Sequence, residues 1–174
     1  MNVAVLSAAD APQYRAVMLH AYEYAADAFT STPEERAAEP DAWWVRRIAD
    51  PAGLTVAFGA FEAKALTGVV ALEYSAKPKT KHKALVVGMY VMPDWRGRGV
   101  ARALMQSAIG HASVRGGITV VQLEVTEGNG PATALYESLG FQVYGIEPMA
   151  VLTPGGYRSK VHMWRQLGGA PRPR

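Results

Sequence analysis

The sequence predicts an α/β fold, in which a mixed β-sheet carries helices on both faces. Between residues 54 and 91, apolar runs of strand length follow one another across short polar turns, which is typical of antiparallel hairpins. After residue 84, strand patterns alternate with helical patterns, which indicates a mixed sheet. The chain of 174 residues can form one domain with a full core but not two. We therefore expect a single domain over residues 1–167 and a flexible tail over residues 168–174.

Seven strands are predicted from apolar runs that end at glycine, proline or polar residues. They cover residues 3–6, 54–61, 66–74, 84–91, 118–125, 141–144 and 157–167. The expected sheet therefore has about seven strands.

Four helices are predicted from the spacing of apolar residues and from capping residues. They are residues 11–25, residues 41–48, a helix from Val100 that stops at Gly116-Gly117, and a helix that follows Asn129. Pro131 lies in the first turn of the last helix and Gly140 follows its end, which is the usual placement of these residues.

Composition excludes several classes of protein. The chain has no cysteine, which excludes disulfides, thiolate metal sites and a cysteine nucleophile. Its four histidines are scattered without the spacing of metal ligands, so no metal site is expected. Residues 1–50 hold eight acidic and four basic side chains, whereas the rest of the chain holds seven and fourteen. A uniformly basic nucleic-acid binder would not show this distribution, so no nucleic-acid partner is expected.

No segment predicts a membrane span or a secretory signal. The longest uninterrupted apolar run, residues 84–92, is about half of the roughly 20 residues that a helix needs to cross a bilayer. The N-terminus has no basic stretch followed by an apolar one. We therefore expect a cytoplasmic protein without a membrane partner.

The most informative segment, residues 89–102, runs from an apolar strand through a turn of glycine and arginine into a helix. Gly97 and Gly99 let the backbone approach an anion closely, and the helix start adds unpaired N–H donors and partial positive charge. The segment therefore predicts a loop that binds a diphosphate cofactor. A strand-to-helix turn without a ligand is the alternative, and it leaves the two glycines and Arg96 unexplained.

Motif spacing limits which cofactor the loop can hold. No run has the spacing of a nucleotide-triphosphate P-loop. A dinucleotide fingerprint fails at its last glycine position, where Arg102 stands, and the first acid downstream, Glu124, is further away than a ribose-binding carboxylate. The pattern that does fit is Arg or Gln, two residues, Gly, one residue, and Gly or Ala, which runs from Arg96 to Ala101.

That pattern resembles the cofactor loop of the GCN5-related N-acetyltransferase (GNAT) family. Residues 122–141 add a second resemblance, with a strand, an asparagine-containing turn, a Leu-Tyr helix and a Gly-Phe strand start. Together the two motifs cover about residues 84–144 in the order that the family uses. The resemblance implies a mostly antiparallel sheet, acetyl-CoA as cosubstrate, direct N-acetyl transfer to a primary amine in a ternary complex, and a homodimer.

The resemblance also implies which groups bind acetyl-CoA. Backbone N–H groups of the loop are expected to hold the pyrophosphate, and the strand before it offers backbone groups to the pantetheine arm and the acetyl carbonyl. Asn129 can contact the cofactor arm, although a role as a helix cap explains it equally well. The cofactor-binding candidates are Met89, Tyr90, Val91, Arg96, Gly97, Arg98, Gly99, Val100, Ala101, Arg102 and Asn129.

Two residues are the candidates for proton transfer. Tyr136 stands where the family commonly keeps a tyrosine near the cofactor sulfur, and its hydroxyl can protonate the departing thiolate. Residues 85–91 contain no acid, so the glutamate base of some family members is missing there. His82, at the start of that strand, has suitable chemistry for a base. Glu73, Glu124 and a chain of water molecules are the alternatives.

The acceptor and the activity itself are left open. The family builds its acceptor pocket from the N-terminal region, whose excess of acids would suit a cationic amine. Residues 28–35 and 145–150 resemble a branch of small bacterial members, but Ser159 and Lys160 stand where that branch tends to have an acidic pair. A catalytically silent CoA-binding or regulatory module is the alternative to an enzyme, because the strand glutamate is missing. A nucleotide-binding domain is a third possibility.

Overall fold

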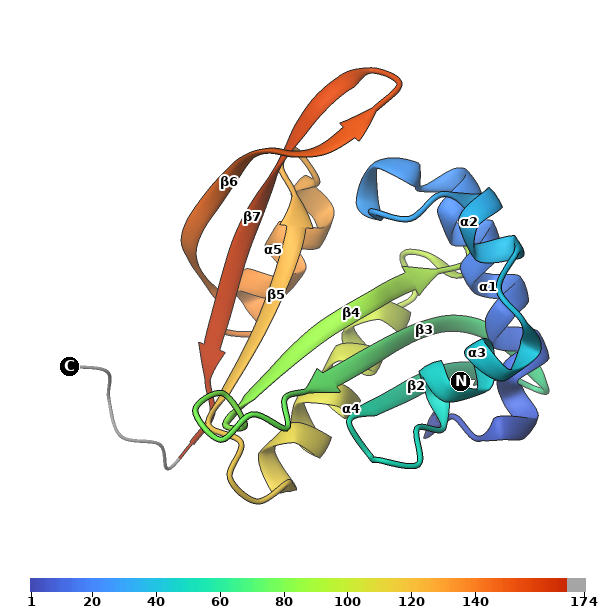
Figure 1. Ribbon diagram of the computed structural model, residues 1–174, viewed down its shortest axis with the longest axis horizontal. Coiled ribbons are helices and arrows are strands. Elements are labelled where there is room, and N and C mark those ends of the chain that lie inside the picture. Colours follow the sequence, from blue (N-terminus) through green and yellow to red (C-terminus); the bar gives the residue numbers. More distant parts are fainter. Residues whose placement is uncertain (169–174) are drawn as a thin grey trace.

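The computed structural model describes residues 1–168 and contains one seven-stranded sheet (Figure 1). Its strands are β1 (Asn2–Val5), β2 (Thr55–Glu62), β3 (Ala65–Tyr74), β4 (Lys83–Val91), β5 (Val120–Thr126), β6 (Gln142–Thr153) and β7 (Gly156–Gln166). They lie in the order β1-β2-β3-β4-β5-β7-β6, and every neighbouring pair is antiparallel except β4 and β5. The predicted mixed, mostly antiparallel sheet of seven strands is confirmed.

Helices cover both faces of the sheet, as predicted (Figure 1). On one face lie α1 (Ala11–Tyr24), α2 (Pro33–Ala37) and α3 (Asp41–Ile48), with the short turns η1 (Ala8–Asp10) and η2 (Ala26–Ala28). On the other face lie α4 (Val100–Val114), which η3 (Pro93–Trp95) precedes, and α5 (Gly130–Ser138). Among residues 1–168, no helix combines the length and the apolar character that spanning a bilayer requires.

Strand β3 separates two hydrophobic cores, because its side chains alternate between the two faces of the sheet. Val70 and Leu72 pack in the core that contains α4, whereas Val69 and Ala71 pack in the core that contains α1 and α3. All four side chains are at most 1% exposed. Burial of apolar surface on both faces makes β3 the centre against which the other elements pack.

The core around α1 and α3 ends at β4. Within residues 1–168 it contains side chains from β2, β3 and β4, but none from β5, β6 or β7. On β5, the polar residues Gln122 and Glu124 alternate with the buried residues Val121 and Leu123. This alternation is typical of a sheet with one uncovered face. The face of β5 and β7 next to the N-terminal helices is therefore open to polar side chains.

The last hairpin corrects the prediction. The strand predicted at residues 141–144 is wrong in extent, because β6 continues to Thr153 and pairs with β7 along most of its length. Gly145 and Pro148 interrupt the apolar pattern, and the register with β7 shifts near each of them. Bulges and an edge position allow a strand to contain proline, whose missing N–H needs no partner there.

The other predicted elements agree with the structure to within a few residues at their ends. The helix predicted at residues 41–48 is α3, and the helix predicted after Asn129 is α5. That residues 1–167 form a single domain stays a prediction. Of the predicted flexible tail, residues 169–174 lie outside the described residues.

A bulge in β4 opens the sheet beside β5. Between the paired positions Val69–Tyr90 and Ala71–Val87, β4 contains one residue more than β3. Gly88 lies in this extra step with a φ of +63°, a left-handed conformation that glycine adopts without strain. The parallel pairing of β4 with β5 ends just before it, where Val86 pairs with Leu123. Beyond this point the two strands diverge, as Figure 1 shows.

Replacement of Gly88 by alanine is expected to destabilise the protein, because an L-residue at this φ costs about 1–2 kcal/mol. A steric clash is not the cause of this loss, since the nearest atom to an added Cβ is Met18 Cε at 3.8 Å. Gly110→Ala in α4 is the matched control, because an added Cβ there meets no atom within 4 Å. It should stabilise the helix by up to about 1 kcal/mol. Urea unfolding measures both changes, and equal effects would contradict the role of Gly88.

Candidate active site

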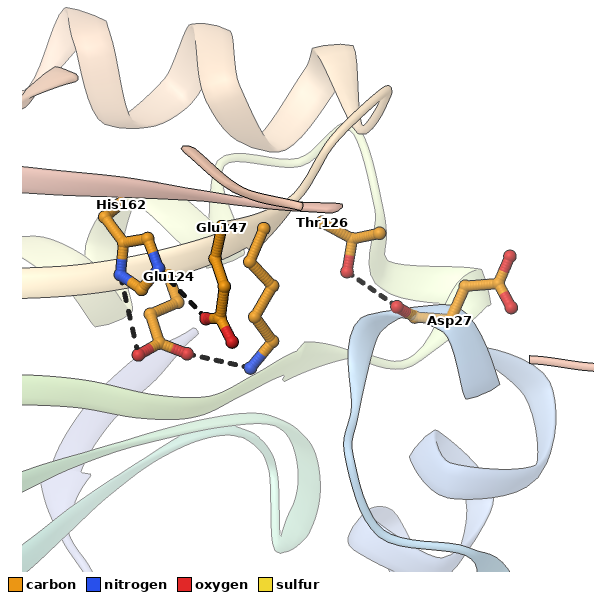
Figure 2. Close-up of polar contacts among 6 residues, drawn as sticks. Asp27, Glu124, Thr126, Glu147 and His162 are labelled. Carbon is orange, nitrogen blue, oxygen red and sulfur yellow. Dashed lines mark hydrogen bonds and ion pairs between the residues drawn. The ribbon is translucent and has the colours of Figure 1, made fainter. Parts of the chain in front are cut away.

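A cleft of about 310 Å³ lies where β4 and β5 diverge. Val87 and Gly88 line it from β4, and Glu124 and Thr126 line it from β5. Further walls come from α1, α5, β7 and the segment after η2. The Thr126 hydroxyl donates a hydrogen bond of 2.6 Å to the Asp27 carbonyl, which joins the end of β5 to η2 (Figure 2). The cleft is therefore bounded by the diverging strands β4 and β5 and by the helices beside them.

The glycine and arginine loop connects the end of β4 to α4. Gly97 and Gly99 have φ values of +72° and +78°, and a Cβ added to either would meet no atom within 4 Å. The first hydrogen bond of α4 runs from the Ala103 N–H to the Gly99 carbonyl at 3.0 Å. The N–H groups of residues 100–102 precede that bond, so they have no acceptor within the helix. Open space and unpaired donors at the positive end of a helix dipole suit a phosphate group.

The arginines of this loop make contacts within the protein. Arg96 Nε donates to the Val91 carbonyl at 3.1 Å, which ties the loop to the end of β4. Arg102 Nη2 donates to the Ser138 hydroxyl of α5 at 2.9 Å, and Arg98 lies over a neighbouring tryptophan ring. These contacts fix the shape of the loop. The main-chain N–H groups are therefore the principal candidates to bind phosphate.

Asn129 and Tyr136 line the cleft from α5 and the residue before it. Asn129 Oδ1 accepts a hydrogen bond of 3.3 Å from the Ala132 N–H and so caps α5, one of the two roles that the sequence left open. Tyr136 is 7% exposed and packs edge-on against Phe141. Burial raises the pKa of Tyr136 to about 12, so its hydroxyl stays protonated at neutral pH and can donate a proton.

The structure does not bring His82 to the cleft. His82 precedes β4 and stands six residues before Gly88, which is about 20 Å of extended strand. Its carbonyl accepts the N–H groups of Thr119 and Val120, at the end where β4 and β5 are still paired. The lysine-rich connection over residues 77–83 lies at the same end of β4, opposite the glycine loop. His82 and Tyr136 are therefore at different places in the fold.

Figure 2 shows a cluster of charged side chains on the uncovered face of β5, β7 and β6. Glu124 lies between two basic groups, with Oε2 at 2.8 Å from Lys160 Nζ and Oε1 at 3.7 Å from His162 Nδ1. His162 Nε2 lies 3.2 Å from Glu147 Oε2. Glu124 and Lys160 line the cleft, whereas the Glu147 side chain is 54% exposed. The cluster thus connects a carboxylate in the cleft with solvent.

The N-terminal wall of the cleft is basic. Arg47 Nη1 lies 2.8 Å from Glu73 Oε1, and both residues line the cleft. Arg36 of α2 also lines it, but its neighbours Glu34 and Glu35 do not. The acidic acceptor pocket that the N-terminal composition suggested is therefore not found in this cleft.

A sequence model of the acetyltransferase (GNAT) family matches residues 18–141. The chain belongs to the GNAT family. The match begins within α1 and ends after α5, so it contains the glycine loop and both strands that form the cleft. The family resemblance of the two sequence motifs is confirmed.

N-acetyltransferase relatives and solved GNAT-fold structures resemble the whole or part of the chain. The L-amino acid N-acetyltransferase AaaT of Escherichia coli K12 is 28% identical over 125 residues, which cover 72% of this chain and 76% of that protein. The ribosomal protein bS18-alanine N-acetyltransferase of Salmonella typhimurium is 36% identical over 81 residues, which cover 47% of this chain and about half, 54%, of that protein. The structure of yncA from Salmonella typhimurium with acetyl-CoA has the same fold, with a TM-score of 0.80, 22% identity and coverage of 100% and 98% of the two chains.

Sequence reasoning missed several residues of this GNAT cleft. Gly88 had a signal, because a glycine inside an apolar strand suggests a bulge. Lys160 and His162 also had a signal, since alternate residues of a strand share a face. Which strand lies beside them, and therefore that they meet Glu124 and Glu147, depends on the sheet order.

Alkaline titration tests the burial of Tyr136. Between pH 10 and about 12 the unfolded chain loses the Tyr136 proton while the folded chain keeps it, so the free energy of unfolding falls as pH rises. In Tyr136→Phe this decline should be less steep, by up to about 1.4 kcal/mol per pH unit. Burial also raises the pKa of Tyr14 to about 12. Tyr14 is present in both proteins, so its contribution cancels in the difference between their slopes. Urea unfolding at a series of alkaline pH values measures the slopes, and parallel curves would contradict the assignment.

Proposed function

We propose that this protein transfers an acetyl group from acetyl-CoA to a primary amine by direct attack of the amine in a ternary complex. The observation that carries the proposal is a single cleft, between the diverging strands β4 and β5, that contains both a buried tyrosine and a carboxylate, Tyr136 and Glu124. Membership of the GNAT family and the N-acetyltransferase relatives support acyl transfer.

The main-chain N–H groups of residues 97–101 are the proposed binding site for the pyrophosphate of acetyl-CoA. Both loop glycines leave the backbone accessible, and the start of α4 adds donors and partial positive charge. Acetyl-CoA supplies the acetyl group as a reactive thioester. With the pyrophosphate at the loop, the pantetheine arm would follow β4 and bring the thioester between Met89 and Tyr136.

The end of β4 supplies backbone donors for the acetyl carbonyl. Beyond the last pair with β5, at Val86, the edge of β4 that faces the cleft has no strand partner at Met89, Tyr90 and Val91. An N–H group there can stabilise the carbonyl oxygen as it gains negative charge. Loss of such a donor typically raises the activation barrier by about 3 kcal/mol.

Glu124 is the proposed base. An amine of the lysine type, with a reference pKa of about 10.4, is mostly protonated near neutral pH and must lose a proton before it attacks. The Glu124 carboxylate can take that proton directly or through a water molecule, and His162 and Glu147 continue from it toward solvent. His82 has no part in the proposed reaction, because it does not line the cleft and precedes the end of β4 that is still paired with β5.

Tyr136 is the proposed acid. The amine nitrogen forms a bond with the acetyl carbon and loses its second proton to water, the carbon–sulfur bond breaks, and the electron pair leaves with the sulfur. The Tyr136 hydroxyl gives its proton to that sulfur, which makes the thiol of CoA a better leaving group. The resulting tyrosinate regains a proton from that water, because burial, which raises the pKa of Tyr136 to about 12, favours the neutral hydroxyl.

A catalytically silent CoA-binding or regulatory module is less well supported, because the cleft is lined by a tyrosine and a carboxylate with the chemistry of an acid and a base. The names of the two relatives described above indicate an L-amino acid and the alanine of a ribosomal protein as acceptors, and both can present a primary amine. Within the described residues, no group of three or more histidine, aspartate or glutamate side chains is arranged so that it could hold a metal ion, and independence from metal stays a prediction. A homodimer, a cytoplasmic location and the absence of a nucleic-acid partner stay predictions as well.

Acetyl transfer is tested by mixing the protein with acetyl-CoA and a panel of amines and following thiol release. The release should depend on the amine, and Tyr136→Phe should lower kcat about 100-fold or more, because proton donation to the leaving group is lost. Its Kd for CoA, measured by calorimetry, should stay close to that of the wild type. Tight CoA binding without turnover of any amine would support the silent module instead.

Glu124→Gln should lower kcat/KM at neutral pH by about 100-fold, because the base is lost while the shape of the cleft is kept. The deficit should shrink as pH rises, since the amine then loses its proton to water. Glu127→Gln, in the exposed turn after β5, is the control and should behave like the wild type. A deficit that is the same at every pH would argue against a base at position 124.

A further inference from the structure

Lys160 is a cation held directly beside the proposed base. Its Nζ lies 2.8 Å from Glu124 Oε2, and its side chain is only 16% exposed. In the pairing of β5 with β7, Lys160 stands opposite Thr126 and His162 stands opposite Glu124. Lys160 therefore reaches Glu124 diagonally, from the side on which β4 and β5 diverge. The cleft thus presents a negative and a positive group next to each other.

The position of Lys160 determines what can lie beside the amine of the acceptor. When the amine is hydrogen-bonded to Glu124, at about 2.7–3.2 Å, a group on its α-carbon lies within similar reach of Lys160 Nζ. If that group is a carboxylate, the charges of Glu124, the ammonium, the α-carboxylate and Lys160 alternate in sign around the contact between the acceptor and the cleft. If it is a neutral peptide carbonyl, Lys160 finds no second anion.

We propose that the acceptor is a free α-amino acid and that Lys160 binds its α-carboxylate. This inference rests on the proposed function, since it takes the amine to be at Glu124. An α-amino acid places its amine and its carboxylate on one carbon, as Glu124 and Lys160 place their complementary charges side by side. The amine of a peptide N-terminus has an amide at that place, so the same contact selects against it.

The other charges of the cleft leave room for an added anion. Its lining contains three basic side chains, Arg36, Arg47 and Lys160, and two carboxylates, Glu73 and Glu124, and Glu39 lies 3.7 Å from Arg36 outside the lining. Glu73 is paired with Arg47 at 2.8 Å, so it does not oppose a carboxylate at Lys160 directly. His162 approaches the other oxygen of Glu124, and Glu147, which stands opposite Lys160 in the pairing of β6 with β7, is paired with His162. An α-carboxylate would therefore meet Lys160 without a facing, unpaired acid.

The test compares kcat/KM for the L-amino acid that the enzyme uses best with that for the amide of the same amino acid. The wild type should prefer the free amino acid. Lys160→Gln should lower this preference by about 10- to 100-fold, the typical effect of a lost hydrogen bond to a charged group. Lys160→Glu should lower it further and favour the amide. Because the acceptor pair is the same in every variant, differences in amine basicity cancel.

Lys64→Glu is the control for the change in net charge, because Lys64 is exposed in the turn between β2 and β3. It should leave the preference at the wild-type value. A wild type that uses the amide as well as the free amino acid, or a preference unchanged in both Lys160 variants, would overturn the inference and leave the proposed acetyl transfer intact. Absence of transfer to every amine, with CoA bound, would overturn both.

Discussion

The cleft exists because the parallel pairing of β4 and β5 stops partway along the two strands. Up to Val86 and Leu123 the two strands share a ladder of hydrogen bonds, and past that point Gly88 takes a left-handed conformation and β4 bulges away. Had the pairing continued, the edges of both strands would be occupied and the cleft would not exist. One glycine in an otherwise apolar strand thus exposes backbone groups at the place where a thioester needs donors.

A second constraint concerns which part of the sheet the N-terminal helices cover. The core around α1 and α3 takes side chains from β2, β3 and β4, and leaves the same face of β5 and β7 uncovered. Charged side chains can occupy that face without losing contact with water, which would be costly in a closed core. Glu124 lies there in contact with both Lys160 and His162, and Glu124 and Lys160 reach the cleft. The boundary between covered and uncovered sheet is therefore where proton transfer and acceptor binding are proposed.

Local sequence patterns predicted the parts of the molecule that depend on neighbouring residues. The glycine loop before α4, the cap at Asn129 and the helix that carries Tyr136 follow from turn chemistry and helical spacing, and the structure has them. The long β6 was not predicted, because Pro148 breaks the apolar pattern and only the edge position and the bulges make the strand possible. His82 has the right intrinsic chemistry for a base, but chemistry alone does not say at which end of β4 the cleft opens. The contact of Glu124 with Lys160 joins residues 36 positions apart and requires the register of β5 with β7.

Amide hydrogen exchange, with and without CoA, tests the central claim most directly, namely that the unpaired end of β4 and the loop after it hold the cofactor. Bound CoA should slow exchange at residues 89–91 and 97–102, where N–H groups gain acceptors and lose contact with water. Exchange at residues 84–86, which already pair with β5, should stay the same. Protection confined to other segments, such as the lysine-rich connection over residues 77–83, would contradict the account.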